Sequence, residues 1–278
     1  MKKVQRLGKE ITLEELKKLQ MDVLSAIDEF CREKGIRYSM SNGTMLGAVR
    51  HKGYIPWDDD IDIYVLREDY IKLMEVFPKI YNNHYCLVSL ERNNKWDFPF
   101  AKAYDNRTIV YEDASYNELF GVNIDIFPVD DVPDDDSIWN EYNQNRRMLY
   151  NKRLYLFTRF PFSLRPKAFV RWCYYGFLKF FHSRRKRAEL IDKNAQKWNG
   201  MGYHYVFECC QGIFQKKKFK KEIFNKTIKY PFEDRFFMGF ENYDEYLRNG
   251  FGDYMKLPPV EKRVTHHNNK AYWKNPSK

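Results

Sequence analysis

Residues 41–63 have the sequence SNGTMLGAVRHKGYIPWDDDIDI, and this stretch decides the fold. Its first half opens with a Gly-Thr turn at residues 43–44 and continues as a short helix to residue 51. Its second half passes through a Pro-Trp pair into four aspartates, where Asp60 and Asp62 alternate with isoleucines at the period of a β-strand. We therefore predict a turn and helix that are followed at once by an acidic strand.

The four aspartates within residues 58–62 repel one another, so the fold gains nothing from them unless a cation is bound. Because side chains two positions apart share one face of a strand, we expect Asp58, Asp60 and Asp62 on one face and the isoleucines on the other. Mg²⁺ prefers oxygen ligands, which it often shares with substrate phosphates. The alternatives are an acidic surface loop and a calcium loop. Apolar residues run through the acids, however, and the Gly and Glu of a calcium loop are missing at the expected spacing.

A third carboxylate lies in a strongly strand-forming run. Asp125 stands between Ile124 and Ile126, so its side chain lies either on a solvent face or in a buried site. Placed beside Asp60 and Asp62, it would complete a three-carboxylate site in which the third acid accepts a proton from a nucleophile. We predict these three aspartates as the catalytic and metal-binding residues.

Groups that suit phosphate are expected nearby. The strand-to-helix turn at Gly43-Thr44 presents backbone N–H groups and the positive end of a helix dipole, and the glycine allows close approach. Arg50 adds positive charge, with a solvated helix end as the alternative. Lys102 falls inside an apolar strand-like run, where it either binds substrate phosphate or faces water from an edge strand.

The composition is that of a folded protein with an anionic partner. The 278 residues are 44% hydrophobic and 18% aromatic, enough to bury the core of one large domain or two small ones. The net charge is +10 although the central stretch is acidic, so the basic excess lies elsewhere and indicates nucleic acid, phospholipid or a phosphorylated substrate. Five cysteines without a C-x-x-C pair indicate reduced thiols and a cytoplasmic protein. We expect neither a signal peptide nor a membrane-spanning segment.

Other elements follow from periodicity and caps. Thr12 and Glu15 form a capping box at the start of a predicted helix over 13–34, and Gly35 ends it. A second helix is predicted over 67–77. Strands are predicted over 37–41, 85–90, 98–104 and 107–111, with a tight turn at residues 105–106 between the last two.

Four motifs stand out together. They are GTMLGAVR at 43–50, IPWDDDID at 55–62, IDIFP at 124–128 and GDYMKLPP at 252–259, the last followed by Lys262, Arg263 and His266. These motifs resemble those of the LicD family of phosphotransferases, with fukutin-type proteins as more distant relatives. The resemblance covers residues 38–130 and 232–267.

The resemblance implies a nucleotidyltransferase-like α/β fold with a small mixed sheet flanked by helices. It assigns Gly43-Thr44 to the family's turn, Asp60 and Asp62 to its Asp-x-Asp pair, and Asp125 to its third acid. It implies Mg²⁺, or Mn²⁺ in its place, held by these three aspartates. The family moves a phosphorylated alcohol, most often phosphocholine, from a CDP-activated donor to a hydroxyl of a surface glycan such as lipopolysaccharide, teichoic acid or a capsule precursor.

The same resemblance places further residues at the substrate. Asp58 is expected beside the metal ligands, and Arg50 and Lys102 are expected at the phosphates. Asp253 and His266 are candidates for contact with the nucleotide or the acceptor, with packing of the C-terminal tail as the alternative.

We expect three parts: a catalytic core over 1–135, a helical region over 136–230, and a segment over 231–278 that packs back on the core. Within the middle part, residues 164–181 mix Phe and Trp with Lys and Arg and lead into the basic run 184–187. This mixture is typical of an interfacial helix on an anionic membrane, which would place the enzyme beside a lipid-linked glycan at the inner face of the cell membrane. An aromatic core helix with a solvated basic end is the alternative.

Other functions remain open at this stage. The same fold could add a nucleotide to RNA or to a small molecule, although the motifs argue against nucleic acid as a partner. A CDP-ribitol, CDP-glycerol or phosphoethanolamine transferase is a closer alternative, and a catalytically inactive binding module is a third. The sequence does not specify the donor alcohol, the acceptor sugar or the oligomeric state.

Overall fold

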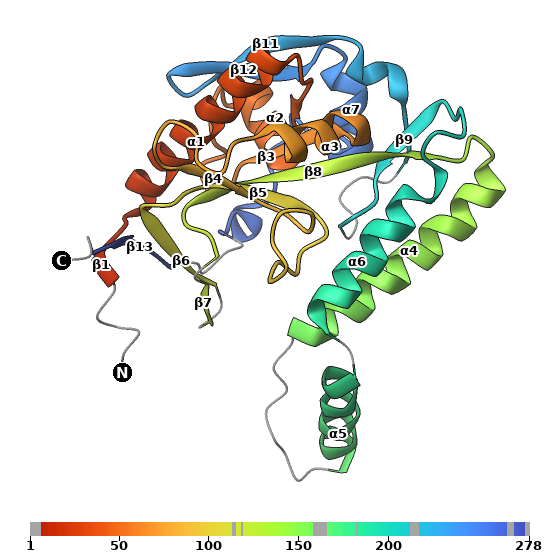
Figure 1. The fold of residues 1–278 in the computed structure, drawn as a ribbon. Coiled ribbons are helices and arrows are strands. Elements are labelled where there is room, and N and C mark those ends of the chain that lie inside the picture. The colour runs from red at the N-terminus through yellow and green to blue at the C-terminus, as the bar shows by residue number, and fades with distance from the viewer. Residues whose placement is uncertain are drawn as a thin grey trace.

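The computed structural model describes residues 7–112, 115–117, 119–157, 166–181, 183–211, 217–265 and 270–275. These residues form a mixed sheet flanked by helices, a second, smaller sheet and a helical projection (Figure 1), so the predicted α/β fold class is confirmed. The helices are α1 (Leu13–Lys34), α2 (Asn42–Arg50), α3 (Arg67–Val76), α4 (Asp136–Phe157), α5 (Pro166–Phe181), α6 (Arg184–Ala195) and α7 (Tyr243–Phe251). The strands are β1 (Leu7–Glu10), β2 (Ser39–Met40), β3 (Asp62–Leu66), β4 (Tyr85–Val88), β5 (Ala101–Asp105), β6 (Thr108–Glu112), β7 (Ser115–Asn117), β8 (Asn123–Val132), β9 (Tyr205–Glu208), β10 (Phe219–Lys220), β11 (Thr227–Phe232), β12 (Arg235–Phe240) and β13 (Lys270–Lys274).

The long strand β8 is the central strand of the main sheet and crosses the middle of the molecule (Figure 1). Its first half pairs in parallel with β3 on one side and antiparallel with β5 on the other. Its second half pairs antiparallel with β9, which in turn pairs with β10. The antiparallel strands β2 and β4 extend the sheet beyond β3 and β5. One strand therefore carries Asp125 near its start and leads at its other end to the helical projection.

Helix α1 begins and ends where the sequence predicts. The Thr12 side chain accepts a hydrogen bond from the backbone of Glu15, the Glu15 carboxylate accepts one from the backbone of Thr12, and Gly35 adopts a left-handed conformation with φ of 62°. The helix packs against β5, β8 and β12. The predicted helix over 67–77 is also confirmed, since α3 buries Tyr70, Leu73 and Met74.

Two local predictions are wrong. The acidic strand begins at Asp62 rather than at Asp60, so the residues before it are not ordered by strand alternation. The tight turn predicted at residues 105–106 forms at residues 106–107, but the strands it joins do not pair as a hairpin, because β5 and β6 belong to different sheets. The polar groups of that turn are bonded elsewhere: the Thr108 hydroxyl donates to the carbonyl of Asp105 and accepts from the N–H of Val122, which ties the turn to the start of β8.

The C-terminal residues lie against the N-terminal ones. In the smaller sheet, of order β1-β13-β6-β7, strand β13 lies between β1 and β6. The hairpin β11–β12 and helix α7 contribute to the same buried cluster as α1, α2 and β3, and Tyr246 of α7 is fully buried in it. The middle of the chain contributes to the core as well, because β9 and β10 are strands of the main sheet.

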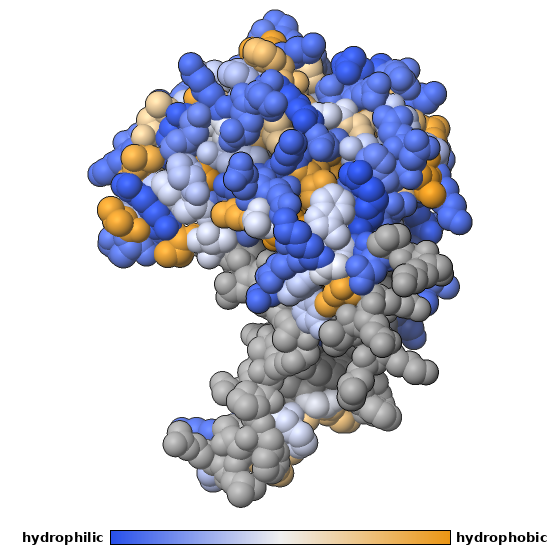
Figure 2. Space-filling view, turned by 90° about the vertical axis from the view of Figure 1, so that its left-hand side faces the viewer, coloured by the Kyte–Doolittle hydropathy of each residue, from blue (hydrophilic) through white to orange (hydrophobic). Residues whose placement is uncertain are grey.

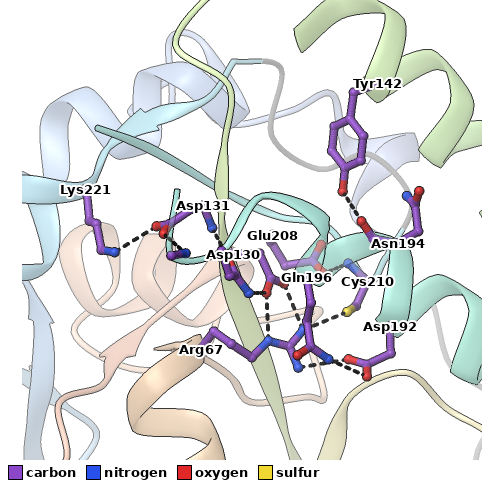
Figure 3. A network of polar contacts seen from close by, with 12 residues as sticks. Arg67, Asp130, Asp131, Tyr142, Asp192, Asn194, Gln196, Glu208, Cys210 and Lys221 are labelled. Carbon is purple, nitrogen blue, oxygen red and sulfur yellow. Dashed lines mark hydrogen bonds and ion pairs between the residues drawn. The ribbon is translucent and has the colours of Figure 1, made fainter. Parts of the chain in front are cut away.

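The helices α4 and α6 lie side by side and project from the main body, with α5 at the far end of the projection (Figure 1). A buried polar network joins this projection to the sheet (Figure 3). Arg67, the first residue of α3, forms ion pairs with Asp130 of β8 at 2.7 Å and with Asp192 of α6 at 2.8 Å. The side chains of Arg67 and Asp130 are almost fully buried, and Asn199 donates a further hydrogen bond to Asp130. The network fixes the base of the projection to the central strand.

Substitution Asp130→Ala is expected to lower the free energy of unfolding by about 3 kcal/mol, because it leaves a buried guanidinium without its bidentate partner. Urea unfolding measures this value. The control is Glu241→Ala, which removes the exposed partner of Lys226 at 3.6 Å and is expected to cost less than about 1 kcal/mol. Equal losses in the two variants would contradict the role assigned to the network.

Candidate functional site

A cleft of about 750 Å³ lies beside the acidic stretch. One wall comes from the start of α2, residues 55–62 and Asp125, and the other from residues 251–262 near the C-terminus. The cleft brings together most of the predicted site residues: Gly43, Arg50, Asp58, Asp60, Asp62, Asp125 and Asp253. His266, the remaining C-terminal candidate, lies outside the described residues.

Strand register places three charged side chains in one row. Asp62 of β3 is directly opposite Asp125 of β8, and Asp125 is directly opposite Lys102 of β5. The Lys102 ammonium donates to Oδ1 of Asp125 at 2.5 Å and lies 5.3–5.9 Å from the ring centres of three phenylalanines, Phe98, Phe100 and Phe120. Because β5 lies between β4 and β8 and Lys102 is buried, the alternative of a water-facing lysine on an edge strand is wrong.

The carboxylate of Asp62 lies among like charges. Burial, together with the carboxylates of Asp60 and Asp125, raises the pKa of Asp62 well above its usual range, and a hydrogen bond from Asn42 opposes that shift. Its backbone N–H donates to the Thr44 hydroxyl at 2.8 Å. The first residue of β3 is therefore held in place by groups from the first turn of α2.

This geometry corrects the expectation for Thr44. The residue is buried and its hydroxyl accepts the Asp62 N–H, so it lies beneath the cleft and supports the acidic strand instead of facing phosphate. Gly43 does line the cleft, and a Cβ atom there would lie 2.5 Å from Oδ2 of Asp58. Any larger residue at this position would require the Asp58 carboxylate to move.

Asn42 is a residue whose role the sequence did not reveal. It has a φ of 47°, a left-handed conformation that asparagine tolerates better than most residues. Its amide Nδ2 donates to Asp62 at 3.0 Å, its Oδ1 accepts from the hydroxyl of Tyr64 at 3.0 Å, and its backbone N–H donates to the hydroxyl of Tyr246 at 2.9 Å. Asn42 thus joins Asp62 to α7, some 200 residues along the chain. An asparagine directly before the Gly-Thr turn was the only available signal.

The C-terminal part of the cleft lining adds positive charge. It includes Lys256 and Lys262, and Arg50 reaches across from α2 to donate to the backbone carbonyl of Tyr254 at 2.6 Å. The guanidinium of Arg263 lies 5.6 Å from the ring centre of Trp57, which also lines the cleft. A cleft lined by both carboxylates and basic side chains suits a substrate that carries phosphates.

The donor types at the acidic wall fit a hard divalent cation. Asp60, Asp62 and Asp125 supply carboxylate oxygens, the ligands that Mg²⁺ prefers. Within the described ranges, no group of three or more His, Cys, Asp or Glu side chains is arranged to hold a metal ion. One reason is visible in the contacts, because Lys102 engages Oδ1 of Asp125 and Asn42 engages Oδ2 of Asp62.

The loop that follows β9 reaches the same cleft. Gln211 lines the cleft, its carbonyl accepts a hydrogen bond from Arg146 of α4 at 2.6 Å, and its N–H donates to the carboxylate of Glu208 at 2.8 Å. Burial raises the pKa of Glu208 to about 7, although Arg146 and the backbone N–H groups of Gln211 and Cys210 act in the opposite direction. The helical projection therefore supports one edge of the site.

This shift predicts a pH dependence of stability. The ordinary pKa of the Glu208 carboxyl is 4.5 and its folded value is about 7, so the folded state holds this proton more tightly than the unfolded chain does. The contribution of Glu208 is most favourable below pH 4.5 and is lost as the pH rises towards 7. Glu208→Gln retains an oxygen acceptor for both N–H groups but does not titrate. Over this range the free energy of unfolding of the original protein should therefore fall by about 3 kcal/mol relative to that of the variant. Urea unfolding at several pH values measures it, and parallel pH curves would contradict it.

The chain is similar to known proteins over the residues that form this site. A family model described as "LicD/FKTN/FKRP, nucleotidyltransferase domain" matches residues 35–172. The lipopolysaccharide cholinephosphotransferase LicD of Haemophilus influenzae is 30% identical over 275 residues, which are 95% of this chain and 99% of that protein. The human ribitol 5-phosphate transferase FKRP is 49% identical over 35 residues, only 7% of its length, and an uncharacterized protein of Rickettsia prowazekii is 45% identical over 64 residues. With a relative of this identity aligned over almost the whole of both chains, the protein belongs to the LicD family.

Proposed function

We propose that this protein is a phosphotransferase that moves phosphocholine from CDP-choline to a hydroxyl of a cell-surface glycan, with lipopolysaccharide, teichoic acid and capsule precursors as the candidate acceptors. The observation that carries the proposal is the similarity over almost the whole chain to a lipopolysaccharide cholinephosphotransferase, in a chain whose cleft is lined by both carboxylates and basic side chains. A CDP-alcohol carries a diphosphate, whose negative charge suits these basic side chains.

In the proposed reaction, an oxygen of the acceptor forms a bond to the phosphorus that bears choline, and the bond from that phosphorus to CMP breaks. Asp125 orients the acceptor hydroxyl and takes its proton through Oδ2, while Lys102 holds Oδ1 at 2.5 Å and fixes the carboxylate in place. Arg50, Lys256 and Lys262 hold the phosphate oxygens of the departing CMP.

The acidic wall is proposed to bind Mg²⁺, or Mn²⁺ in its place, through Asp60, Asp62 and Asp125. When bound, the ion would neutralise the negative charge of the transferring phosphoryl group. Asp58 lies next to this group and is proposed to position it or its ligands, and Asp253 is proposed to contact the donor from the other wall. Aromatic side chains of the cleft, Trp57, Phe251 and Tyr254, offer surfaces for the choline or the cytosine ring.

Release of CMP by purified protein tests this proposal. With Mg²⁺ and a glycan acceptor, release is expected from CDP-choline and not from CDP-ethanolamine, CDP-glycerol or CDP-ribitol, and a chelator should abolish it. Asp60→Asn and Asp62→Asn are each expected to reduce kcat about a thousandfold, since each removes charge stabilisation at the reacting phosphate.

The matched control is Asp59→Asn. Asp59 is the neighbouring carboxylate and does not line the cleft, although the cavity of about 90 Å³ that it lines shares Asp60 and Asp125 with the cleft, so its removal should cost much less activity than theirs. Release from CDP-ribitol alone would replace phosphocholine with ribitol phosphate, the group named for the human relative. If no CDP-alcohol led to release of CMP, and if the protein incorporated nucleotides into RNA with Mg²⁺, the proposal would be overturned.

The support of Asp62 by α2 generates a separate prediction. Asn42→Ala and Thr44→Val each remove a hydrogen bond to Asp62 without touching the cleft's charges, and each should lower kcat about 10- to 100-fold while KM changes little. Thr44→Ser keeps the hydroxyl and should keep the activity. Steady-state kinetics separate kcat from KM, and a pure rise in KM in both variants would show that these residues bind substrate directly.

A further inference from the structure

Helix α5 exposes large apolar side chains at the far end of the projection (Figure 1). Phe169, Val170, Trp172, Tyr174 and Phe177 are all exposed, with 66% of Val170 and 61% of Phe177 accessible. Positions 169, 173 and 177 follow a spacing of four, as do positions 170 and 174, so these side chains share one broad face of the helix. In the space-filling view, the coloured atoms at the lower end of the molecule, at the height of α5, include apolar surface (Figure 2).

Positive charge lies directly beside this apolar face. No aspartate or glutamate occurs between Glu141 and Glu189, a stretch that includes all of α5. Lys167 is exposed in the first turn of α5. Two residues separate α5 from α6, and the first four residues of α6 are Arg184, Arg185, Lys186 and Arg187. Arg184 and Lys186 are exposed. The end of the projection is therefore both apolar and strongly basic.

We propose that α5 is an interfacial helix that docks this protein on an anionic lipid bilayer. Its apolar face would enter the boundary between headgroups and acyl chains, and the basic side chains at both of its ends would contact anionic headgroups. A helix of 16 residues is about 24 Å long, and no helix in the described part of the chain is long and apolar enough to cross a membrane. The helix would therefore lie in the plane of the membrane surface.

The positive charge beside α5 favours a bilayer over a second copy of the chain as the partner of this helix. Two copies that met through α5 would bring their basic segments 184–187 together, and like charges at close range oppose association. An anionic bilayer offers the opposite charge next to an apolar layer, which complements both features of the projection. The inference rests on α5 and α6 alone and does not depend on the proposed phosphotransfer.

The test is sedimentation of the full-length protein with vesicles, without donor or acceptor. Binding is expected to vesicles of phosphatidylcholine mixed with phosphatidylglycerol, and raised salt should weaken it. Phe177→Ser should weaken binding at least about tenfold, and Lys186→Gln about fivefold. Circular dichroism and thermal unfolding establish that each variant is folded.

Matched controls lie on the main body. Phe236 of β12 is 62% exposed and Lys229 of β11 is exposed, so Phe236→Ser and Lys229→Gln remove equivalent groups at a distance from α5 and should leave binding unchanged. Equal binding to vesicles of phosphatidylcholine alone, or equal losses from the controls, would overturn the proposal. A dimer that forms without vesicles and is lost in Phe177→Ser would also overturn it, and would make α5 a contact between copies.

Discussion

Repulsion among carboxylates is the constraint on which the rest of this structure depends. Asp58, Asp60, Asp62 and Asp125 line one wall of a single cleft, and the pKa of Asp62 is raised because burial and its neighbours disfavour its charge. Two neighbouring groups reduce this repulsion: the Lys102 ammonium donates a hydrogen bond to Asp125, and the Asn42 amide donates one to Asp62. Three basic side chains that also line the cleft, Arg50, Lys256 and Lys262, offset the negative charge at longer range. The proposed binding of a cation and a diphosphate would use this clustered charge, which the fold keeps at a local cost in stability.

The two strands that carry the aspartates were predictable because their signals are local. Apolar alternation around Asp62 and Asp125 marks buried strands, and the capping box at Thr12 marks the start of the long first helix. Parallel pairing of β3 with β8 then places the two acids in register, which agrees with the grouping expected from the sequence. Asp58 and Asp60 were expected on the same strand face as Asp62. Both precede β3, so they reach the cleft from a loop and not from a strand.

Contacts between distant segments could not be read from the sequence. Nothing local indicates that Asn42 meets Tyr246, that Lys102 meets Asp125, or that Gln211 borders the cleft, because each pairing depends on strand order and on how loops close. The failed hairpin at residues 105–106 has the same cause: a turn-forming sequence was present, but Thr108 and Val122 connect it to another strand. Thr44 illustrates a third case, in which the residue type was anticipated and its hydroxyl turned out to hold the backbone of Asp62.

The two walls of the cleft come from opposite ends of the chain, residues 42–62 and residues 251–262, with the central strand β8 between them in sequence. A ribosome releases the acidic wall long before the basic one, and domains assemble from the N-terminus during synthesis. A nascent chain that has folded β3 and β8 therefore already holds the clustered carboxylates, yet lacks the lysines of the other wall and the Tyr246 hydroxyl that bonds Asn42. The cleft is completed only after residues 251–262 have been made and folded, so its basic side chains arrive after the strands that carry the carboxylates.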